Sequence, residues 1–388
     1  DYFKINHGTA WDGEYLYDGS SVKIIAADSV DVATLEFDSQ TALDNNTNTK
    51  TPIFGYRQVY RHYKQQEKRR KNPEKEEKPD KGKAPIFFDD QILESTTQLL
   101  ENRATNDGYF FNEASYEIDT NENNRTVTVD YKIKVGPPHR IDSVAYFIQD
   151  SSVWAVVLEV RPKTLLKKGE RYDLDLLKSE RSRLQTALRE RGYYFSQDND
   201  FVFLADTLIG TQEVDLLVKL KKDVPESHLT PQRLKQVNVF PNIELGDTLP
   251  SINADTVIHQ GIRIVCQDCP LRPKIIDEAF ATKAGELYSP EKHDKSLRRL
   301  ASYNMFRYVS FSYDRVPGSD TSLILNAYLQ PQLRRRAEFE VGMSYNSARY
   351  FGPEIAFGYT NRNLLRGAEL LRIEGDFSYA FFLGDRDL

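Results

Sequence analysis

The chain has 388 residues, of which 39% are hydrophobic and 28% are charged, and its formal net charge is −6. This composition is typical of folded domains, leaves room for about two to four of them, and lacks the positive charge that a nucleic-acid-binding protein carries. No run of eighteen apolar residues occurs, so the sequence predicts no membrane-spanning helix. The chain begins abruptly at Asp1, and we expect a processed or truncated N-terminus.

A charged segment at residues 64–84 consists mostly of lysine, arginine and glutamate, contains two prolines and has almost no side chain to bury. Such a segment cannot offset the entropy of ordering by burying apolar surface. We therefore predict a solvated loop or a disordered insertion, whose deletion would change the stability of the protein little.

Three segments share one pattern, which is an aromatic residue, a helix-capping residue and, later, a helix-ending residue followed by an apolar pair. The segments are residues 88–110, 172–194 and 288–306. In the first two, twenty residues separate the leading aromatic residue from a glycine; in the third the interval is sixteen and asparagine replaces the glycine. A unit used three times predicts an array of similar modules.

Each segment predicts a helix followed by two strands. The predicted N-caps are Asp89, Asp173 and Ser289, and the predicted helix-ending residues are Gly108, Gly192 and Asn304. Return strands follow at 127–135, 214–220 and 323–329, and opening strands at 141–148 and 262–266 precede the second and third helical regions. We therefore predict α+β modules of order β-α-α-β-β, with helices on one face of a three-stranded sheet, at 15–136, 137–224 and 225–333.

Residues 334–388 change character, because large apolar residues alternate there with polar or small ones. The alternation covers 339–345, 355–359 and 371–381. It is typical of membrane β-barrel strands, and also of a soluble antiparallel sheet with one wet face. We predict the first strands of an antiparallel transmembrane β-barrel. A barrel needs at least about eight strands, so we expect the chain to be part of a longer protein.

The two cysteines, Cys266 and Cys269, leave open a local disulfide or a pair of free thiols, whereas structural zinc would need more ligands than the sequence offers nearby. No metalloprotease, nucleophile-elbow, phosphate-loop or dinucleotide motif is present. We therefore predict a protein that is not an enzyme and that uses no metal or cofactor.

The tandem modules, with Gly-Tyr-Phe or Gly-Tyr-Tyr after the helix, resemble POTRA domains. Such an array ahead of a C-terminal barrel resembles the BamA/TamA superfamily of outer-membrane assembly proteins. Residues 13–19 and 361–369 are similar to the TamA-like TamL proteins of Bacteroidetes, although the lipobox cysteine of that branch is absent. The resemblance implies an outer-membrane location with POTRA modules in the periplasm. It also implies a TamB-like periplasm-spanning partner, unfolded outer-membrane protein clients, outer-membrane lipid and no nucleic acid.

Three groups of residues are candidate sites under this resemblance. Free sheet edges would receive client strands by β-augmentation, and the candidate edge residues are Phe201, Phe203, Val309, Phe311 and Tyr313. The first barrel strand would be a seam that opens sideways, with Phe339, Val341, Gly342, Met343 and Tyr345. Arg334, Arg335 and Arg336 would bind lipid phosphate or form a solvated basic turn. The alternative function is a non-catalytic adhesion or scaffold array at the cell surface, with a soluble C-terminal segment.

Overall fold

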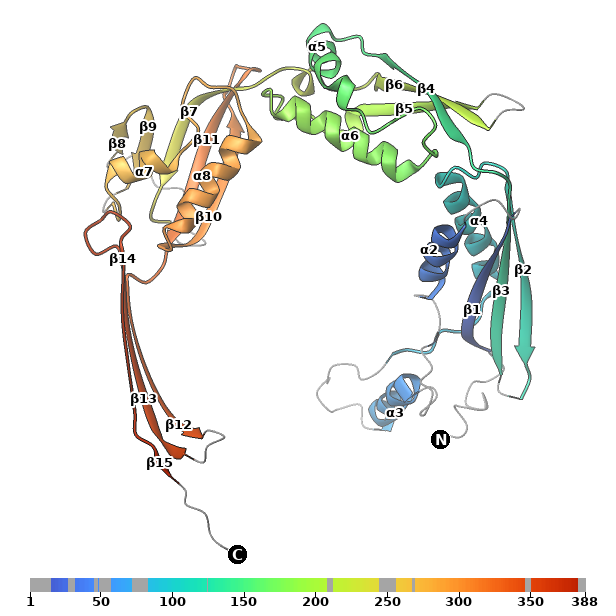
Figure 1. Ribbon diagram of the computed structural model, residues 1–388, viewed down its shortest axis with the longest axis horizontal. Helices are drawn as coiled ribbons and strands as arrows, with labels where there is room; N and C mark the ends of the chain where they lie inside the picture. The colour runs from blue at the N-terminus through green and yellow to red at the C-terminus, as the bar shows by residue number, and fades with distance from the viewer. Residues whose placement is uncertain are drawn as a thin grey trace, which may run out of the picture. The chain divides into compact units, whose positions relative to one another are not determined.

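The structure is a computed structural model, shown in Figure 1. It describes residues 15–26, 32–44, 48, 57–71, 83–123, 125–207, 212–243, 256–266, 269–345 and 350–382. These residues form a mixed α+β protein with four separate sheets. The chain divides into two compact units, which are 1–147 with 164–181 and 202–219, and 148–163 with 182–201 and 220–388. The module boundaries near 136, 224 and 333 stay predictions.

The first sheet has the order β1-β3-β2, with β1 parallel and β2 antiparallel to β3. The strands are β1 (Leu16–Ile25), β2 (Asn112–Asn121) and β3 (Thr126–Val135), and the helices are α2 (Ala33–Asp44), α3 (Arg57–Lys71) and α4 (Asp90–Asn106). Helices α2 and α4 pack on one face of the sheet (Figure 1). The predicted alternation of β3 is confirmed, because its inward residues Val127, Val129, Tyr131, Ile133 and Val135 are all buried.

Helix α3 corrects one prediction. Residues 64–71, expected in a loop or a disordered insertion, are helical, while residues 72–82 lie outside the described part of the chain. The segment has no internal glycine or proline before Pro73 and is rich in glutamine, lysine and arginine, which are good helix formers. Because of α3, Gly108 follows the third helix of its module and not the second.

The second sheet has the order β4-β6-β5, with β4 parallel to β6. The elements are β4 (Arg140–Phe147), α5 (Ser151–Val160), η1 (Arg161–Lys163), α6 (Leu174–Arg189), η2 (Asp198–Asp200), β5 (Phe201–Thr207) and β6 (Glu213–Leu220). A small apolar core joins the two parallel strands to the start of α6 through Ile141, Leu166, Leu177, Val214 and Leu216. This strand order matches that of the first sheet, in which the return strand also lies in the middle.

The third sheet has five strands in the order β10-β11-β7-β9-β8, where a three-stranded sheet was predicted. Its elements are η3 (Glu226–His228), β7 (Arg233–Phe240), β8 (Thr256–His259), β9 (Ile262–Val265), α7 (Pro273–Ala279), α8 (Pro290–Ser302), β10 (Phe306–Arg315) and β11 (Ser322–Pro331). The strand predicted at 262–266 exists as β9. However, the opening strand that lies parallel to β11 is β7, so the predicted position of this strand was wrong.

A β-bulge explains why β7 escaped the sequence pattern. Its inward residues are Leu234, Val237 and Val239, and Lys235 is the extra residue that breaks the alternation. The other opening strands carry the bulge at the same place, at Asp18 in β1 and at Asp142 in β4. A bulge is a local irregularity that homologous modules tend to share, so its recurrence supports the repeat.

The helix caps agree with the prediction. The side chain of Asp89 accepts a hydrogen bond from the Gln91 N–H at 3.0 Å, and Asp173 and Ser289 cap α6 and α8 in the same way. Pro290 occupies the first position of α8. Gly108, Gly192 and Asn304 all have positive φ, at 89°, 99° and 50°, two or three residues after the last residue of their helices.

The repeated motif also builds the joints between modules, which the sequence did not reveal. In the first joint, the N–H of His139 donates to the carbonyl of Gly108 at 2.8 Å, and the N–H of Tyr172 donates to the carbonyl of His139 at 2.9 Å. In the second joint, Gln232 donates to Gly192 at 2.8 Å and Tyr288 donates to Gln232 at 3.0 Å. The helix-ending glycine of one module therefore holds the opening segment of the next.

Aromatic side chains fill the same joints. In the first, the Phe110 ring lies 4.9 Å from the Tyr172 ring, and in the second the Tyr194 ring lies 4.8 Å from the Tyr288 ring. Phe110 and Tyr194 are the second aromatic residues after the helix-ending glycines. Tyr172 and Tyr288 directly precede the N-caps of α6 and α8. Such pairs add a directional preference to apolar burial, so each joint is specific as well as compact.

His293 lies beside the second joint and predicts a pH dependence. Its Nδ1 is 2.9 Å from the Tyr313 hydroxyl, and its ring stands edge-on to Phe311. Burial lowers the pKa of His293 below its ordinary value of 6.5, with Arg189 adding to the effect and Asp294 opposing it. As the pH falls below about 6.5, the unfolded chain therefore takes up a proton that the folded module resists.

We expect the free energy of unfolding to decrease between pH 6.5 and pH 5 in the unmodified protein, and to decrease less in His293→Gln. Urea unfolding at pH 7.5 and pH 5.5 measures the difference. Equal pH dependence in the two proteins would contradict the role of His293.

Candidate functional site

The last sheet is antiparallel, with the order β12-β13-β14. Its strands are β12 (Arg335–Tyr345), β13 (Tyr350–Arg362), β14 (Leu370–Ser378) and the short β15 (Phe381–Phe382), which pairs with the start of β13. All three alternating segments predicted from the sequence are strands here. The third ends at Ser378 instead of running on to 381.

The strand register separates the sheet into one apolar and one polar face. Val341, Ile355 and Phe377 lie opposite one another across the three strands, and Phe339 lies opposite Phe357. One residue along, the row on the other face is Glu340, Ala356 and Asp376. Two ion pairs, Arg336 with Glu338 and Arg372 with Glu374, lie on the polar face.

The apolar face is uncovered in the part of the chain that the structure describes. The exposed fractions of Phe339, Val341 and Met343 are 67%, 70% and 75%, and Phe377 is also 70% exposed. A monomeric water-soluble domain rarely exposes a contiguous apolar surface of this kind. The face therefore needs either lipid or another apolar surface.

Strand β12 is one of the two outer strands of this sheet, with β14 at the other side, so its second edge has no partner among the described strands. The predicted seam residues Phe339, Val341 and Met343 lie on the apolar face. Gly342 lies on the polar face opposite Glu354, with no atom within 4 Å of where a Cβ would stand. The backbone of Tyr345 pairs with Phe351, and its side chain lies outside the described atoms.

The predicted edge residues lie on β5 and β10, which are outer strands of their sheets. Their side chains face inward, however. Phe201 is fully buried, Phe203 packs on the core of the second sheet, and Val309, Phe311 and Tyr313 pack on the core of the third. These edges can therefore present backbone groups to a partner, but not the five side chains.

The three predicted arginines have different surroundings. Arg334 donates from Nε to the Asn363 carbonyl and from Nη2 to the Leu364 carbonyl, each at 3.1 Å. Arg336 pairs with Glu338, and Arg335 is exposed. The structure thus ties Arg334 to the turn between β13 and β14 and leaves the other two on the sheet.

This turn, residues 363–369, docks on the third module. The side chain of Asn363 donates from Nδ2 to the Pro270 carbonyl at 2.6 Å, and the Arg272 N–H donates to the Arg366 carbonyl at 3.0 Å. Asn363 is buried, and three non-glycine residues of the turn have positive φ, namely Asn363, Arg366 and Ala368. Such strain persists only where surrounding contacts fix the backbone.

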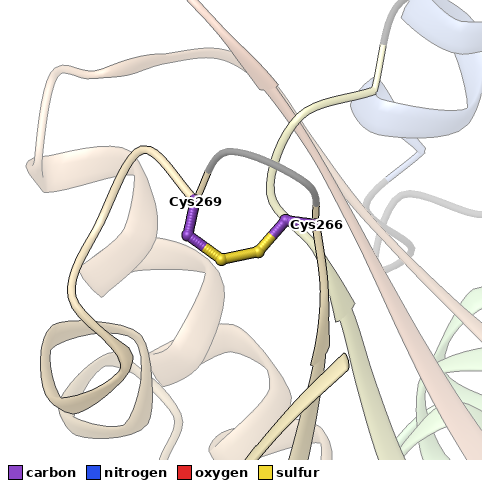
Figure 2. Close-up of a disulfide and its surroundings, with 2 residues drawn as sticks. All are labelled: Cys266 and Cys269. Atoms are coloured by element: carbon purple, nitrogen blue, oxygen red, sulfur yellow. A yellow bond between two sulfur atoms is a disulfide. The ribbon is translucent and has the colours of Figure 1, made fainter. Parts of the chain in front are cut away.

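A disulfide between Cys266 and Cys269 lies next to this docking point (Figure 2). It joins the end of β9 to the segment that leads into α7, and this segment contains Pro270 and Arg272. The disulfide settles the alternative that the sequence left open for the two cysteines. The covalent link restrains the backbone groups that receive the turn.

Within the described residues, no helix is long and apolar enough to cross a membrane. In the same residues, no cluster of three or more histidine, cysteine or carboxylate side chains could hold a metal ion. Among the described residues, the surfaces that could bind a partner are the free strand edges, the apolar face of the last sheet and the arginines at the base of that sheet.

No protein-family model and no curated protein sequence matches this chain. Among solved structures, it is similar to Haemophilus influenzae BamA POTRA3-5, with 14% identity, a TM-score of 0.40 and coverage of 82% of this chain and 98% of that one. It is also similar to BamA from Haemophilus ducreyi lacking POTRA domains 1-3, with 13% identity and a TM-score of 0.42, and to CdiB from Acinetobacter baumannii, with 10% identity and a TM-score of 0.32. These two matches cover 62% of this chain but only 37% and 38% of the other proteins.

Proposed function

We propose that this chain is the POTRA-like region, with adjoining membrane strands, of an outer-membrane protein assembly or translocation factor. The modules lie in the periplasm and the last sheet lies in the outer membrane. One observation carries the proposal, namely a sheet with an exposed apolar face whose outer strand β12 pairs with β13 on one side and has no partner among the described strands on the other.

The apolar face supports a membrane location. Keeping it in water costs about 25 cal/mol for each Å² of apolar surface, whereas lipid tails remove that cost. Strands that alternate between an apolar and a polar face are the pattern of transmembrane barrels. The charged residues of the polar face, such as Glu340 and Glu374, then face the interior.

The free edge of β12 supports strand capture. Unpaired N–H and C=O groups inside a bilayer find no water and each costs several kcal/mol, so pairing with another strand is strongly favoured. An incoming client strand, or the last strand of the same barrel, would satisfy these groups. Gly342 leaves one position of the strand without a side chain.

The modules would deliver clients through main-chain contacts. On the outer strands β5 and β10, the five predicted side chains face inward, while Leu204 and Tyr308 are exposed, so pairing at these edges would use mainly backbone groups. Backbone hydrogen bonds do not distinguish one client sequence from another. Edges of this type suit unfolded outer-membrane proteins of many sequences.

A scaffold or adhesion array is the second candidate, and the array of modules favours it. In that case another protein would cover the apolar face, and residues 334–382 would stay in aqueous solution without detergent. We further propose, from the sequence resemblance at 13–19 and 361–369, that the chain belongs with the TamA-like proteins and uses a TamB-like partner. Co-purification of a TamB-like protein with the array would test this point.

Disulfide trapping tests strand capture at β12. Glu340→Cys places a thiol on the free edge strand, and we expect it to cross-link to a cysteine in an incoming client strand or in the last strand of the barrel. The native cysteines are already joined to each other, so they do not compete.

The matched control for this experiment is Ala356→Cys. Ala356 lies opposite Glu340 but on β13, which has partners on both sides. We expect no client adduct there. Equal yields at the two positions would show that β12 is not the capturing edge.

A further inference from the structure

A cavity of about 220 Å³ lies at the base of the last sheet, within the second compact unit. Three arginines line it, Arg334 from the start of the sheet and Arg362 and Arg366 from the end of β13 and the turn that follows. Gln332 adds an amide, Met305 and Pro331 form an apolar wall, and no carboxylate is among the lining residues.

The three charges stay uncompensated within the described residues. Arg334 donates to two carbonyls, and Arg362 donates from Nη1 to the Leu333 carbonyl at 3.4 Å. Carbonyls orient a guanidinium but carry no net negative charge. None of the three arginines forms an ion pair among the described side chains, although Arg336 and Arg372, nearby on the sheet, both do.

The carboxylate of Glu369, in the same turn as Arg366, is hydrogen-bonded to the backbone of that turn. Glu369 accepts hydrogen bonds from the backbone N–H groups of Leu365 and Gly367, at 3.1 and 3.0 Å. Backbone hydrogen bonds hold the pKa of Glu369 below its usual range. Its charge therefore shapes the turn that carries Arg366, and it is absent from the cavity wall.

We propose that this cavity binds a phosphate group, and that the phosphate belongs to the headgroup of a membrane lipid. Guanidinium groups bind phosphate oxygens in pairs of parallel hydrogen bonds, and several arginines around one small cavity match a group that carries several oxygens. The apolar wall suits the ester side of a lipid headgroup better than a fully hydrated ion.

The position along the strands supports the lipid source, and this step rests on the proposed membrane location. Arg362 comes three residues after Tyr359, which belongs to the apolar face; it starts from the polar side of β13, at the end of the strand and beyond the apolar face. At about 3.3 Å per residue the two are about 10 Å apart along the strand. A headgroup phosphate would occupy this level when lipid tails cover the apolar face.

The arginines that line the cavity differ from those predicted to contact lipid. Of the three consecutive arginines, only Arg334 lines the cavity, and its companions, at the end of β13 and in the turn that follows, lie 28 and 32 residues further along the chain. Arg335 and Arg336 are outside it. They therefore provide a control with the same change in charge on the same part of the sheet.

The test is calorimetric titration of the whole chain in a phosphate-free nonionic detergent. The two probes are dihexanoyl phosphatidic acid below its micelle concentration and inorganic phosphate. We expect the lipid to bind. The double variant with Arg362→Gln and Arg366→Gln should weaken lipid binding by about 100-fold, because each lost charged contact costs about tenfold in affinity. Arg335→Gln with Arg336→Gln should stay within about twofold, because neither residue reaches the cavity.

Each outcome has one meaning. Equal affinity for inorganic phosphate, lost in the first double variant, supports the phosphate pocket and overturns the lipid source. No binding of either probe, or an equal loss in both double variants, overturns the pocket. Thermal unfolding of each variant checks that the turn still folds. Strand trapping at Glu340→Cys reports on the proposed function separately, so capture without lipid binding removes this inference alone.

Discussion

Gly108→Ala is expected to destabilise the protein by about 2 to 4 kcal/mol. Gly108 has a φ of 89°, which an alanine adopts only at a cost of about 1 to 2 kcal/mol. In addition, a Cβ there would stand 2.6 Å from the Tyr172 carbonyl oxygen, which is backbone and cannot rotate away. The alanine would therefore force apart the hydrogen bonds that run from Tyr172 through His139 to Gly108.

Gly169→Ala is the matched control for this prediction. Gly169 has nearly the same φ, 87°, but nothing lies within 4 Å of its Cβ position. Gly169→Ala should lower the free energy of unfolding only by the cost of a positive φ at alanine, about 1 to 2 kcal/mol. Urea unfolding of the two variants measures the difference. Equal losses would mean that the close approach at the joint contributes nothing to stability.

Ile355→Lys is expected to weaken membrane binding by about 30-fold to 1,000-fold. Ile355 lies at the centre of the apolar face on β13, between Val341 and Phe377. A lysine on the lipid side of a membrane strand costs about 2 to 4 kcal/mol near the bilayer midplane. Flotation with phosphatidylcholine vesicles measures the fraction of protein that remains bound.

Ala356→Lys adds the same charge one residue further along the same strand, but on the polar face. We expect this variant to bind vesicles like the unmodified protein. If both lysines reduce binding equally, net charge and not the apolar face controls association. If neither does, the sheet stays out of the membrane and the scaffold function is favoured.

Regular periodicity is the part of this fold that the sequence predicts well. The buried alternation of β3 and β11, the caps Asp89 and Ser289, and the glycine after α4 all express local rules, and all are confirmed. Strand β7 was missed because a bulge at Lys235 breaks its alternation. Helix α3 was missed because its helix-forming residues are also those of disordered segments.

The candidate site also has one part that the sequence predicts and one part that it does not. Alternation alone predicts that Phe339, Val341 and Met343 share a face, and the strand register confirms it. The grouping of Arg334 with Arg362 and Arg366 depends on where a turn folds back after a strand of thirteen residues, and no local pattern encodes that distance. Pairing between distant segments was therefore beyond the sequence argument.

The hydrogen bond from His139 to Gly108 has a consequence for making hybrids of such arrays. A cut between residues 136 and 137 separates two predicted modules in the sequence, yet the contacts that close the first module reach across it to 139 and 172. A graft exchanged at that cut would set one parent's glycine against another parent's tyrosine carbonyl. Exchange points that keep Gly108, His139 and Tyr172 from one parent would preserve the joint. The segment to exchange as one piece is therefore the joint together with the half-module on each side of it.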